Sequence, residues 1–256
     1  VGKDILRFHA VIWPAMLMAA GLPPAKQVFG HGWLLVGGEK MSKSKLTGIA
    51  PNQITDIFGS DAFRYYFMKA IGFGSDGSFS WEDLSARYNA ELANGFGNLA
   101  SRVVAMINKY FDGTVPNPSL YTESDLRIQG VAKQAVVDAN SALDKVAIHD
   151  AIAKVWTLVD ELNGYITEQA PWVLAKDDAN RDRLATVLYT TAEGLRLLAV
   201  LLSPIVPKAT AKLWTSIGGE LGGLEDQRIQ DDTWGLLPAG TKLADLEVLF
   251  PRVEDQ

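Results

Sequence analysis

Apolar side chains recur at intervals of three and four residues through most of the chain after Trp81, and this periodicity is the strongest constraint on the fold. It predicts amphipathic helices, because three to four residues make one helical turn. Such stripes are stable only against other helices, so we expect an all-α bundle. The clearest stripes run through Tyr88, Leu92, Phe96, Leu99, Val103, Met106 and Tyr110, and through Leu184, Leu188, Thr191, Leu195, Leu198 and Leu202.

Three more helices complete the predicted bundle, over residues 126–146, 149–168 and 205–217. Breaks are expected where helix-breaking residues gather, at residues 113–118, at Pro171 and at Pro204. A glycine-rich stretch, residues 218–223, then begins a tail. We expect residues 242–254 of this tail to pack back against the first part of the chain.

The first part of the chain has an α/β pattern instead. Asp4 is placed to cap a helix from about Ile5 to Ala20, and residues 28–36 are predicted to form a strand that ends at a glycine pair. A helix followed by a strand and a loop is typical of an α/β nucleotide-binding domain. Residues 51–80 are predicted to form two short helical pieces, 54–58 and 61–71, and a turn-rich connector.

The composition favours a folded protein with a proper core: 256 residues, of which 48% are hydrophobic and 21% charged. No apolar run approaches the ~18 residues of a membrane helix, so we expect no membrane partner. The absence of cysteine excludes disulfides and cysteine-ligated zinc in this chain. The net charge of −6 argues against a broadly basic surface, so nucleic acid would have to bind at local basic patches.

The stretch Lys40-Met41-Ser42-Lys43-Ser44 lies in a loop that opens with Gly37-Gly38 at the end of the predicted strand. Open α/β sheets bind their ligands at the carboxyl ends of strands. Two lysines three residues apart on a small, flexible loop are suited to gripping a polyphosphate. From these residues alone, a solvated basic turn is the alternative.

The flanking sequences carry a family resemblance. The string HGWLLVGGEKMSKS, with GKDILRFHAVIWPAML before it and DAFRYYFM after it, resembles class I aminoacyl-tRNA synthetases, specifically the methionyl-tRNA synthetases. NLASR at 98–102 and EQAPWVLAK at 168–176 extend the resemblance over essentially the whole chain. It implies a Rossmann-like catalytic fragment with the lysine loop (1–48), a connector of the stem-contact type (49–80) and an α-helical anticodon-binding domain with a tail (81–256).

The activity implied by the resemblance is activation of methionine by ATP, with Mg²⁺ accompanying ATP, and transfer of methionine to tRNA(Met). None of His9, His31 and His149 belongs to an H-x-G-H sequence, the second motif of this class. We therefore expect a carboxyl-terminal part of a longer enzyme, whose amino-terminal half supplies that motif. No appended dimerisation module follows Val253 and no signal peptide is visible, which favours a cytoplasmic monomer.

The resemblance also implies roles in catalysis and ATP binding. Lys43 would contact the transition state, assisted by Lys40, and Lys43 would also bind ATP. Asp4 would accept hydrogen bonds from the ribose hydroxyls of ATP. From its position alone, Asp4 is equally a helix cap.

Three residues of the predicted strand are implied near the adenine. These are His31, Gly32 and the backbone of Leu34. A glycine lets a flat ring lie against the backbone. Without the resemblance, His31 is a strand-end histidine that bonds to a neighbour.

Ile5 and His9 are implied to contact the methionine side chain. His9 lies one turn after Ile5 on a largely apolar helix face. A long, polarizable, uncharged substrate suits such a pocket. A lone histidine there is otherwise a core residue with one hydrogen bond.

Asn98, Arg102 and Trp172 match the residues that recognise the CAU anticodon in this family. Asn98 and Arg102 are four residues apart, so they share one helix face, and Trp172 follows a proline at a helix break. The implied roles are base-edge contacts for the first two and base stacking for Trp172. Asp160 and Asn163 would support this site. The alternatives are a polar surface pair and a tryptophan that packs a corner.

Two other functions stay open from the sequence. One is a class I synthetase for leucine, valine or isoleucine, because the substrate pocket is largely outside this sequence. The other is a catalytically inactive tRNA-binding module in which the lysine loop only binds phosphate.

Overall fold

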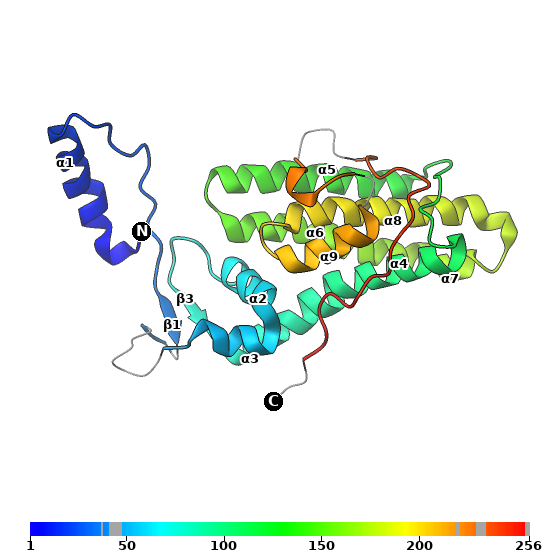
Figure 1. Cartoon of the computed structure of the whole chain (residues 1–256), viewed down its shortest axis with the longest axis horizontal. Helices are drawn as coiled ribbons and strands as arrows, with labels where there is room; N and C mark the ends of the chain where they lie inside the picture. Colours follow the sequence, from blue (N-terminus) through cyan, green and yellow to red (C-terminus); the bar gives the residue numbers. More distant parts are fainter. Residues whose placement is uncertain (37, 41–47, 219–220, 229–233, 254–256) are drawn as a thin grey trace.

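The computed structural model describes residues 1–36, 38–40, 48–218, 221–228 and 234–253. An α/β region is followed by an all-α bundle, which confirms the predicted fold class. Figure 1 shows the first helix standing apart at one end, the small sheet next to it, and the bundle forming the rest of an elongated molecule.

The amino-terminal helix, residues 3–19, changes winding along its length. A 3₁₀ turn, η1 (Lys3–Ile5), leads to a π segment, η2 (Phe8–Ile12), and then to α1 (Trp13–Ala19). Pro14 explains the π segment, because it lacks an N–H and crowds the carbonyl four residues earlier. The helix begins after Gly2, so the predicted cap at Asp4 is wrong: Asp4 lies inside the first turn.

A small sheet follows, with strand order β2-β1-β3. The strands are β1 (Leu34–Val36), β2 (Glu39–Lys40) and β3 (Gly77–Phe79); β1 pairs antiparallel with β2 and parallel with β3. The predicted strand over 28–36 is too long, since only an isolated bridge between Gly2 and His31 precedes Leu34. Strand β3 was not predicted, since it lies in the stretch predicted as a connector.

Helix α2 (Pro51–Lys69) consists of two helical pieces, as predicted, joined at a kink where Gly59 has φ of 82°. The second piece packs in two directions. Tyr66 belongs to a small core with Phe79 and Leu84 beside the sheet. Tyr65 belongs to the main core of the bundle, so α2 ties the sheet to the bundle.

One continuous helix runs from the sheet into the bundle (Figure 1). It comprises α3 (Trp81–Arg87), a π segment η3 (Tyr88–Gly97) and α4 (Asn98–Phe111). The hydroxyl of Ser80 caps its start by accepting the N–H of Asp83 at 3.0 Å.

The bundle confirms the helices predicted from periodicity. Its members are α5 (Glu123–Asp144), α6 (Ile148–Gln169), α7 (Pro171–Leu174), α8 (Arg181–Leu202) and α9 (Pro207–Ile217), with short 3₁₀ turns η4 (Asp178–Asn180) and η5 (Leu224–Asp226). Every residue from Leu184 to Leu202 is buried. In the described part of the chain, residues 178–202 alone are long and apolar enough to cross a membrane, and their apolar stretch is entirely inside the protein.

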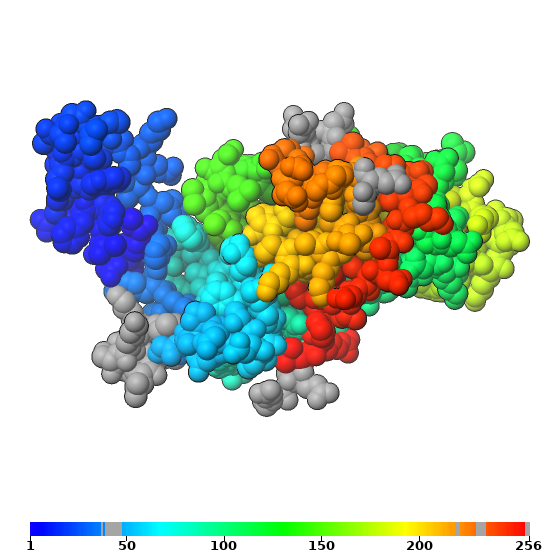
Figure 2. Space-filling model, in the orientation of Figure 1, coloured from blue at the N-terminus to red at the C-terminus, as the bar shows by residue number. Residues whose placement is uncertain are grey.

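The tail packs along the continuous helix and α9 rather than on the sheet, which corrects its predicted position. Phe250 is buried, and the Tyr88 hydroxyl donates to the Pro251 carbonyl at 2.7 Å. Lys212 of α9 pairs with Glu247 at 2.8 Å. Figure 2 shows this last segment, in red, crossing the front of the bundle.

Candidate functional site

Two of the predicted ATP-binding residues, Asp4 and His31, lie close together where the chain start runs beside residues 29–31. His31 N–H donates to the Val1 carbonyl, and Lys3 N–H to the His31 carbonyl, each at 2.9 Å. A Cβ built on Gly2 would lie 2.7 Å from Asp4 Oδ1 and 3.9 Å from His31 Cε1. The Asp4 and His31 side chains therefore flank the same glycine.

His31, Gly32 and Leu34 line one cavity of about 220 Å³, together with the loop at Phe73 and Gly74. The cavity lies at the start of β1.

Gly32 has a reason for being glycine that the sequence did not reveal. A Cβ there would lie 2.1 Å from the Ser75 carbonyl oxygen and 2.5 Å from the Asp76 nitrogen. The loop before β3 thus presses directly on Gly32, and any other residue would push it away. The predicted role beside adenine is a separate matter and stays a prediction.

The His31 ring bonds to its own chain, with Nδ1 2.9 Å from the Gly32 carbonyl oxygen. A carbonyl only accepts, so Nδ1 carries the proton of the neutral ring and Nε2 remains an acceptor. His31 would then accept a hydrogen bond from a ligand at Nε2.

Lys3 and Asp76, which the sequence analysis did not single out, hold this corner together. Lys3 Nζ lies 2.6 and 2.8 Å from the two Asp76 carboxylate oxygens, and Trp33 N–H donates to the same carboxylate at 2.9 Å. The hydrogen bond from Lys3, followed by that from Trp33, lowers the pKa of Asp76. Only a signal linking positions 3 and 76 could have found this pair.

The two predicted catalytic lysines are described unequally. The backbone of Lys40 ends β2 and pairs with Leu35 of β1. Lys43 lies outside the described residues. The start of the lysine loop is therefore fixed to the strand whose other end reaches the cavity.

The predicted methionine contacts lie on the amino-terminal helix. His9 lines an open hollow of about 400 Å³ with Phe8, Ile12, Trp13 and Met16. Its Nδ1 bonds to the Ile5 carbonyl at 3.0 Å, and its ring meets the edge of Trp13. Ile5 does not line the hollow; its side chain is 42% exposed one turn away.

Arg102 and Trp172 come together although they are far apart in sequence. The Arg102 guanidinium carbon lies 5.7 Å from the centre of the Trp172 ring, a distance typical of a cation–π pair. Trp172 is 41% exposed, so the ring is open to a partner. Asn98 is exposed at the first residue of α4, one turn before Arg102.

Of the two residues predicted to support this surface, Asn163 forms hydrogen bonds within the protein. Asn163 Nδ2 donates to the Gly95 carbonyl at 3.3 Å and to the Val159 carbonyl at 3.0 Å. Gly95 belongs to the π segment just before Asn98, so Asn163 helps to fix the start of α4. Burial, and then the nearby Glu91 carboxylate, raise the pKa of Asp160.

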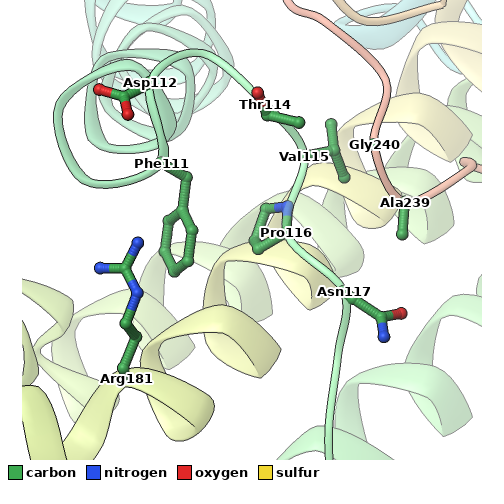
Figure 3. Close-up of a pocket in the computed structure, with 9 residues that line it drawn as sticks. All are labelled: Phe111, Asp112, Thr114, Val115, Pro116, Asn117, Arg181, Ala239 and Gly240. Carbon is green, nitrogen blue, oxygen red and sulfur yellow. The ribbon is translucent and has the colours of Figure 1, made fainter.

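A larger cavity, about 550 Å³, lies elsewhere, at the far end of α4 (Figure 3). Arg181 lies over the Phe111 ring at 4.7 Å, and residues of the 112–117 and 239–240 segments form the other walls. It contains none of the predicted site residues. Its size alone does not make it a reaction centre.

The sequence of the chain was compared with family models and with known proteins. Residues 1–104 match the family of tRNA synthetases class I (M), and residues 115–256 match the anticodon binding domain of methionyl tRNA ligase. A methionine–tRNA ligase of Streptomyces coelicolor is 55% identical over the whole chain. A second, from Caldanaerobacter subterraneus subsp. tengcongensis, is 47% identical over 99% of it. The chain spans 49% and 39% of the length of these two relatives.

Two solved structures from Mycobacterium tuberculosis agree with this match. The apo form of its methionyl-tRNA synthetase superposes with a TM-score of 0.89 at 34% identity, over the whole of this chain and 49% of that one. The form bound by methionyl-adenylate superposes with a TM-score of 0.90 at 36% identity, over 98% and 49%. These matches confirm the resemblance seen in the sequence, and the chain belongs to the methionyl-tRNA synthetase family of class I aminoacyl-tRNA synthetases.

Proposed function

We propose that this chain takes part in activating methionine with ATP and transferring it to tRNA(Met). The supporting observation is the convergence of Asp4, His31, Gly32 and Leu34 at one corner of the sheet, directly before the lysine loop. The relatives that match the chain are methionine–tRNA ligases, and one matching structure holds methionyl-adenylate.

In the activation step, a carboxylate oxygen of methionine attacks the α-phosphorus of ATP. The bond from that phosphorus to the bridging oxygen breaks, and pyrophosphate leaves with the electron pair. Lys43, assisted by Lys40, stabilises the negative charge that grows on these oxygens. One lysine at ~4 Å contributes at most ~4 kcal/mol at an effective dielectric constant of ~20, so its position matters.

The residues around Gly2 contact the ribose and the base of ATP. Asp4 accepts from the ribose hydroxyls, and His31 and the Leu34 backbone lie beside the base. Mg²⁺ bound to ATP would neutralise part of the charge of its phosphates. Within residues 1–36, 38–40, 48–218, 221–228 and 234–253, no three His, Cys, Asp or Glu side chains form a metal-binding group.

Methionine binds against the amino-terminal helix, where the hollow at His9 and Trp13 offers aromatic and aliphatic walls. Ile5 contributes from the neighbouring turn. The hollow suits a flexible thioether, because sulfur makes favourable contacts with aromatic rings.

The bundle recognises the CAU anticodon. The half-exposed Trp172 ring stacks on a base, while Asn98 and Arg102 reach base edges from α4. The chain as a whole has a net negative charge, whereas Arg102 beside Trp172 places a positive charge where the RNA would bind. We also propose the division into a catalytic fragment (1–48), a connector (49–80) and an anticodon-binding part (81–256), acting as a cytoplasmic monomer.

A chimera tests this function. The present chain would replace the matching region of the Streptomyces coelicolor relative, and activation would be measured as methionine-dependent exchange of pyrophosphate into ATP. Lys43→Ala should lower the exchange rate by roughly 10² to 10³ and change the methionine dissociation constant little, because the contact forms mainly in the transition state. Unchanged exchange by Lys43→Ala would contradict the catalytic role of Lys43, and a lack of exchange by the unmodified chimera would favour a module that only binds tRNA.

The second arm uses Trp172→Ala in the same chimera. The tRNA concentration needed for charging should rise, because a stacking contact worth ~1 to 3 kcal/mol is lost. Exchange should stay nearly intact, because the adenylate forms at a remote site. Equal loss of exchange and charging would make Trp172 a structural corner residue.

A further inference from the structure

The turn that presents Trp172 is strained. Helix α6 ends at Gln169, and Ala170 then adopts a left-handed conformation with φ of 43° and ψ of 61°. This conformation is unfavourable for any residue with a Cβ. Pro171 is buried at the start of α7, and Trp172 follows it at the surface. A turn of this kind keeps its shape only where its surroundings hold it.

Gln169 connects this turn to the bundle. Its Oε1 accepts from Arg183 Nη2 of α8 at 2.6 Å, and its Nε2 donates to Glu168 Oε1 at 3.0 Å. Both ends of the amide are therefore engaged. The residue just before the strained alanine is fixed to a helix that is itself buried.

Arg183 is in turn held by a buried carboxylate. Its Nη1 donates to Asp125 Oδ2 of α5 at 2.5 Å, and Asp125 is fully buried. Asp125 also accepts from the Tyr165 hydroxyl and, at 2.7 Å, from the Thr122 N–H. Three helices, α5, α6 and α8, are thus tied together at the end of the bundle that carries Trp172.

The Asp125 carboxylate is charged, as an ion pair with Arg183 requires. Burial alone would raise the pKa of Asp125, but hydrogen bonds from Arg183, Tyr165 and Thr122 outweigh it and lower the pKa. The carboxylate is therefore ionised at neutral pH and keeps Arg183 in place.

We propose that Gln169, held by Arg183, is a positioning residue for RNA recognition: it fixes the α6–α7 turn so that Trp172 faces the base it stacks on. This inference rests on the proposed role of Trp172. Gln169 itself contacts no base. Its effect passes through the turn.

The rest of the molecule offers a matched control. Gln227 also uses its side-chain amide to fix a loop, donating to the Leu221 carbonyl at 2.8 Å and the Gly223 carbonyl at 3.1 Å. None of these partners belongs to α6, α7 or α8. Gln227→Ala removes a comparable loop contact without touching the Trp172 turn.

The experiment measures binding of a fluorescently labelled RNA hairpin, with CAU in its loop, to the 256-residue chain. Trp172→Ala should weaken binding by about 5- to 150-fold, the loss of one base–aromatic stack. Gln169→Ala should weaken it by about 3- to 10-fold, since the ring is kept but its orientation is not fixed. Gln227→Ala should bind within about 2-fold of the unmodified chain, because the Trp172 turn keeps all its contacts.

A double variant distinguishes an effect of Gln169 on the orientation of Trp172 from a general loss of rigidity in the bundle. Once Trp172 is absent, Gln169→Ala should cost nothing more, so the double variant should bind like Trp172→Ala alone. Additive losses would overturn the positioning role, as would normal binding by Gln169→Ala. Normal binding by Trp172→Ala would instead overturn the proposed function of the bundle.

Discussion

Two apolar helices of this protein, α8 and the amino-terminal helix, lie in opposite surroundings: one in the core and the other at the surface. Every residue of α8 from Leu184 to Leu202 is buried, whereas no residue of the amino-terminal helix, residues 3–19, is buried. Met16 and Val11 are 65% and 62% exposed, although either would suit a core. The difference is that α8 packs against α4, α5, α6 and α9, while the amino-terminal helix stands apart (Figure 1).

The comparison teaches that apolar periodicity predicts an amphipathic helix but does not determine whether another element of the chain covers its apolar face. A contiguous exposed apolar surface on a protein generally marks a place where something binds. In this chain, that surface includes the hollow at His9 and Trp13. Four measurements of the stability of this chain test the contrast between the two helices.

The largest effect should come from the buried carboxylate of α8. Glu193 accepts from Arg196 at 2.8 and 2.9 Å and from the backbone N–H groups of Gly235, Leu236 and Leu237. Glu193→Ala leaves the guanidinium buried without this carboxylate, so the free energy of unfolding should fall by about 3–5 kcal/mol. Urea unfolding followed by circular dichroism measures it. A loss below about 1 kcal/mol would mean that α8 is less enclosed than its burial indicates.

Next comes a pure packing change on the same helix. Leu198 is completely buried, so Leu198→Ala removes apolar contacts and leaves a cavity, at a cost of about 2–5 kcal/mol. The same urea titration applies. Should the variant lose much less, the core around α8 must be able to collapse into the space.

A smaller, pH-dependent effect should come from Asp125. Its folded pKa lies below the unfolded value, so the ionised carboxylate adds stability at neutral pH that is lost as the pH falls below about 4. Asp125→Asn should therefore lose less stability than the unmodified chain between neutral and acidic pH. Asp61 acts in the opposite sense, because burial raises its pKa, so only the difference between variant and unmodified chain isolates Asp125. Parallel pH curves for the two proteins would contradict the prediction.

The smallest effect should come from the amino-terminal helix. Met16→Ala exchanges one exposed residue for another with good helix propensity, so the free energy of unfolding should change by no more than about 0.5 kcal/mol. A loss above 1 kcal/mol would break the comparison, because it would show that this face is covered in solution. Repeating the titration at several protein concentrations would tell whether a second copy covers it.

The bundle was predictable because its helices are long and strongly periodic. The family resemblance grouped Arg102 and Trp172 in one predicted site, and in the structure the Arg102 guanidinium lies 5.7 Å from the centre of the Trp172 ring. What it could not give depends on distant positions. The three residues of β3 form a strand only because β1 lies beside them, and Gly32 is explained only by the approach of Ser75.

Local rules also failed where two of them competed. Asp4 is a good cap residue, yet the pairing of Gly2 with His31 starts the helix earlier. Neither π segment was predicted, and a pattern of three and four residues does not distinguish them from α-helix. The pairs of the buried carboxylates Asp125 and Glu193 with Arg183 and Arg196 could not be predicted, because charged residues on a helix normally face water.

The hydrogen bond from Tyr88 to the Pro251 carbonyl joins residues 163 positions apart. Ribosomes extend a chain by roughly 5–20 residues per second, so Tyr88 is synthesised on the order of ten seconds before its partner exists. During that interval nothing from the tail shields Tyr88 and Phe96, which later pack against Phe250. The cover that the tail gives to Tyr88 and Phe96 is therefore absent until residues 250 and 251 have been synthesised.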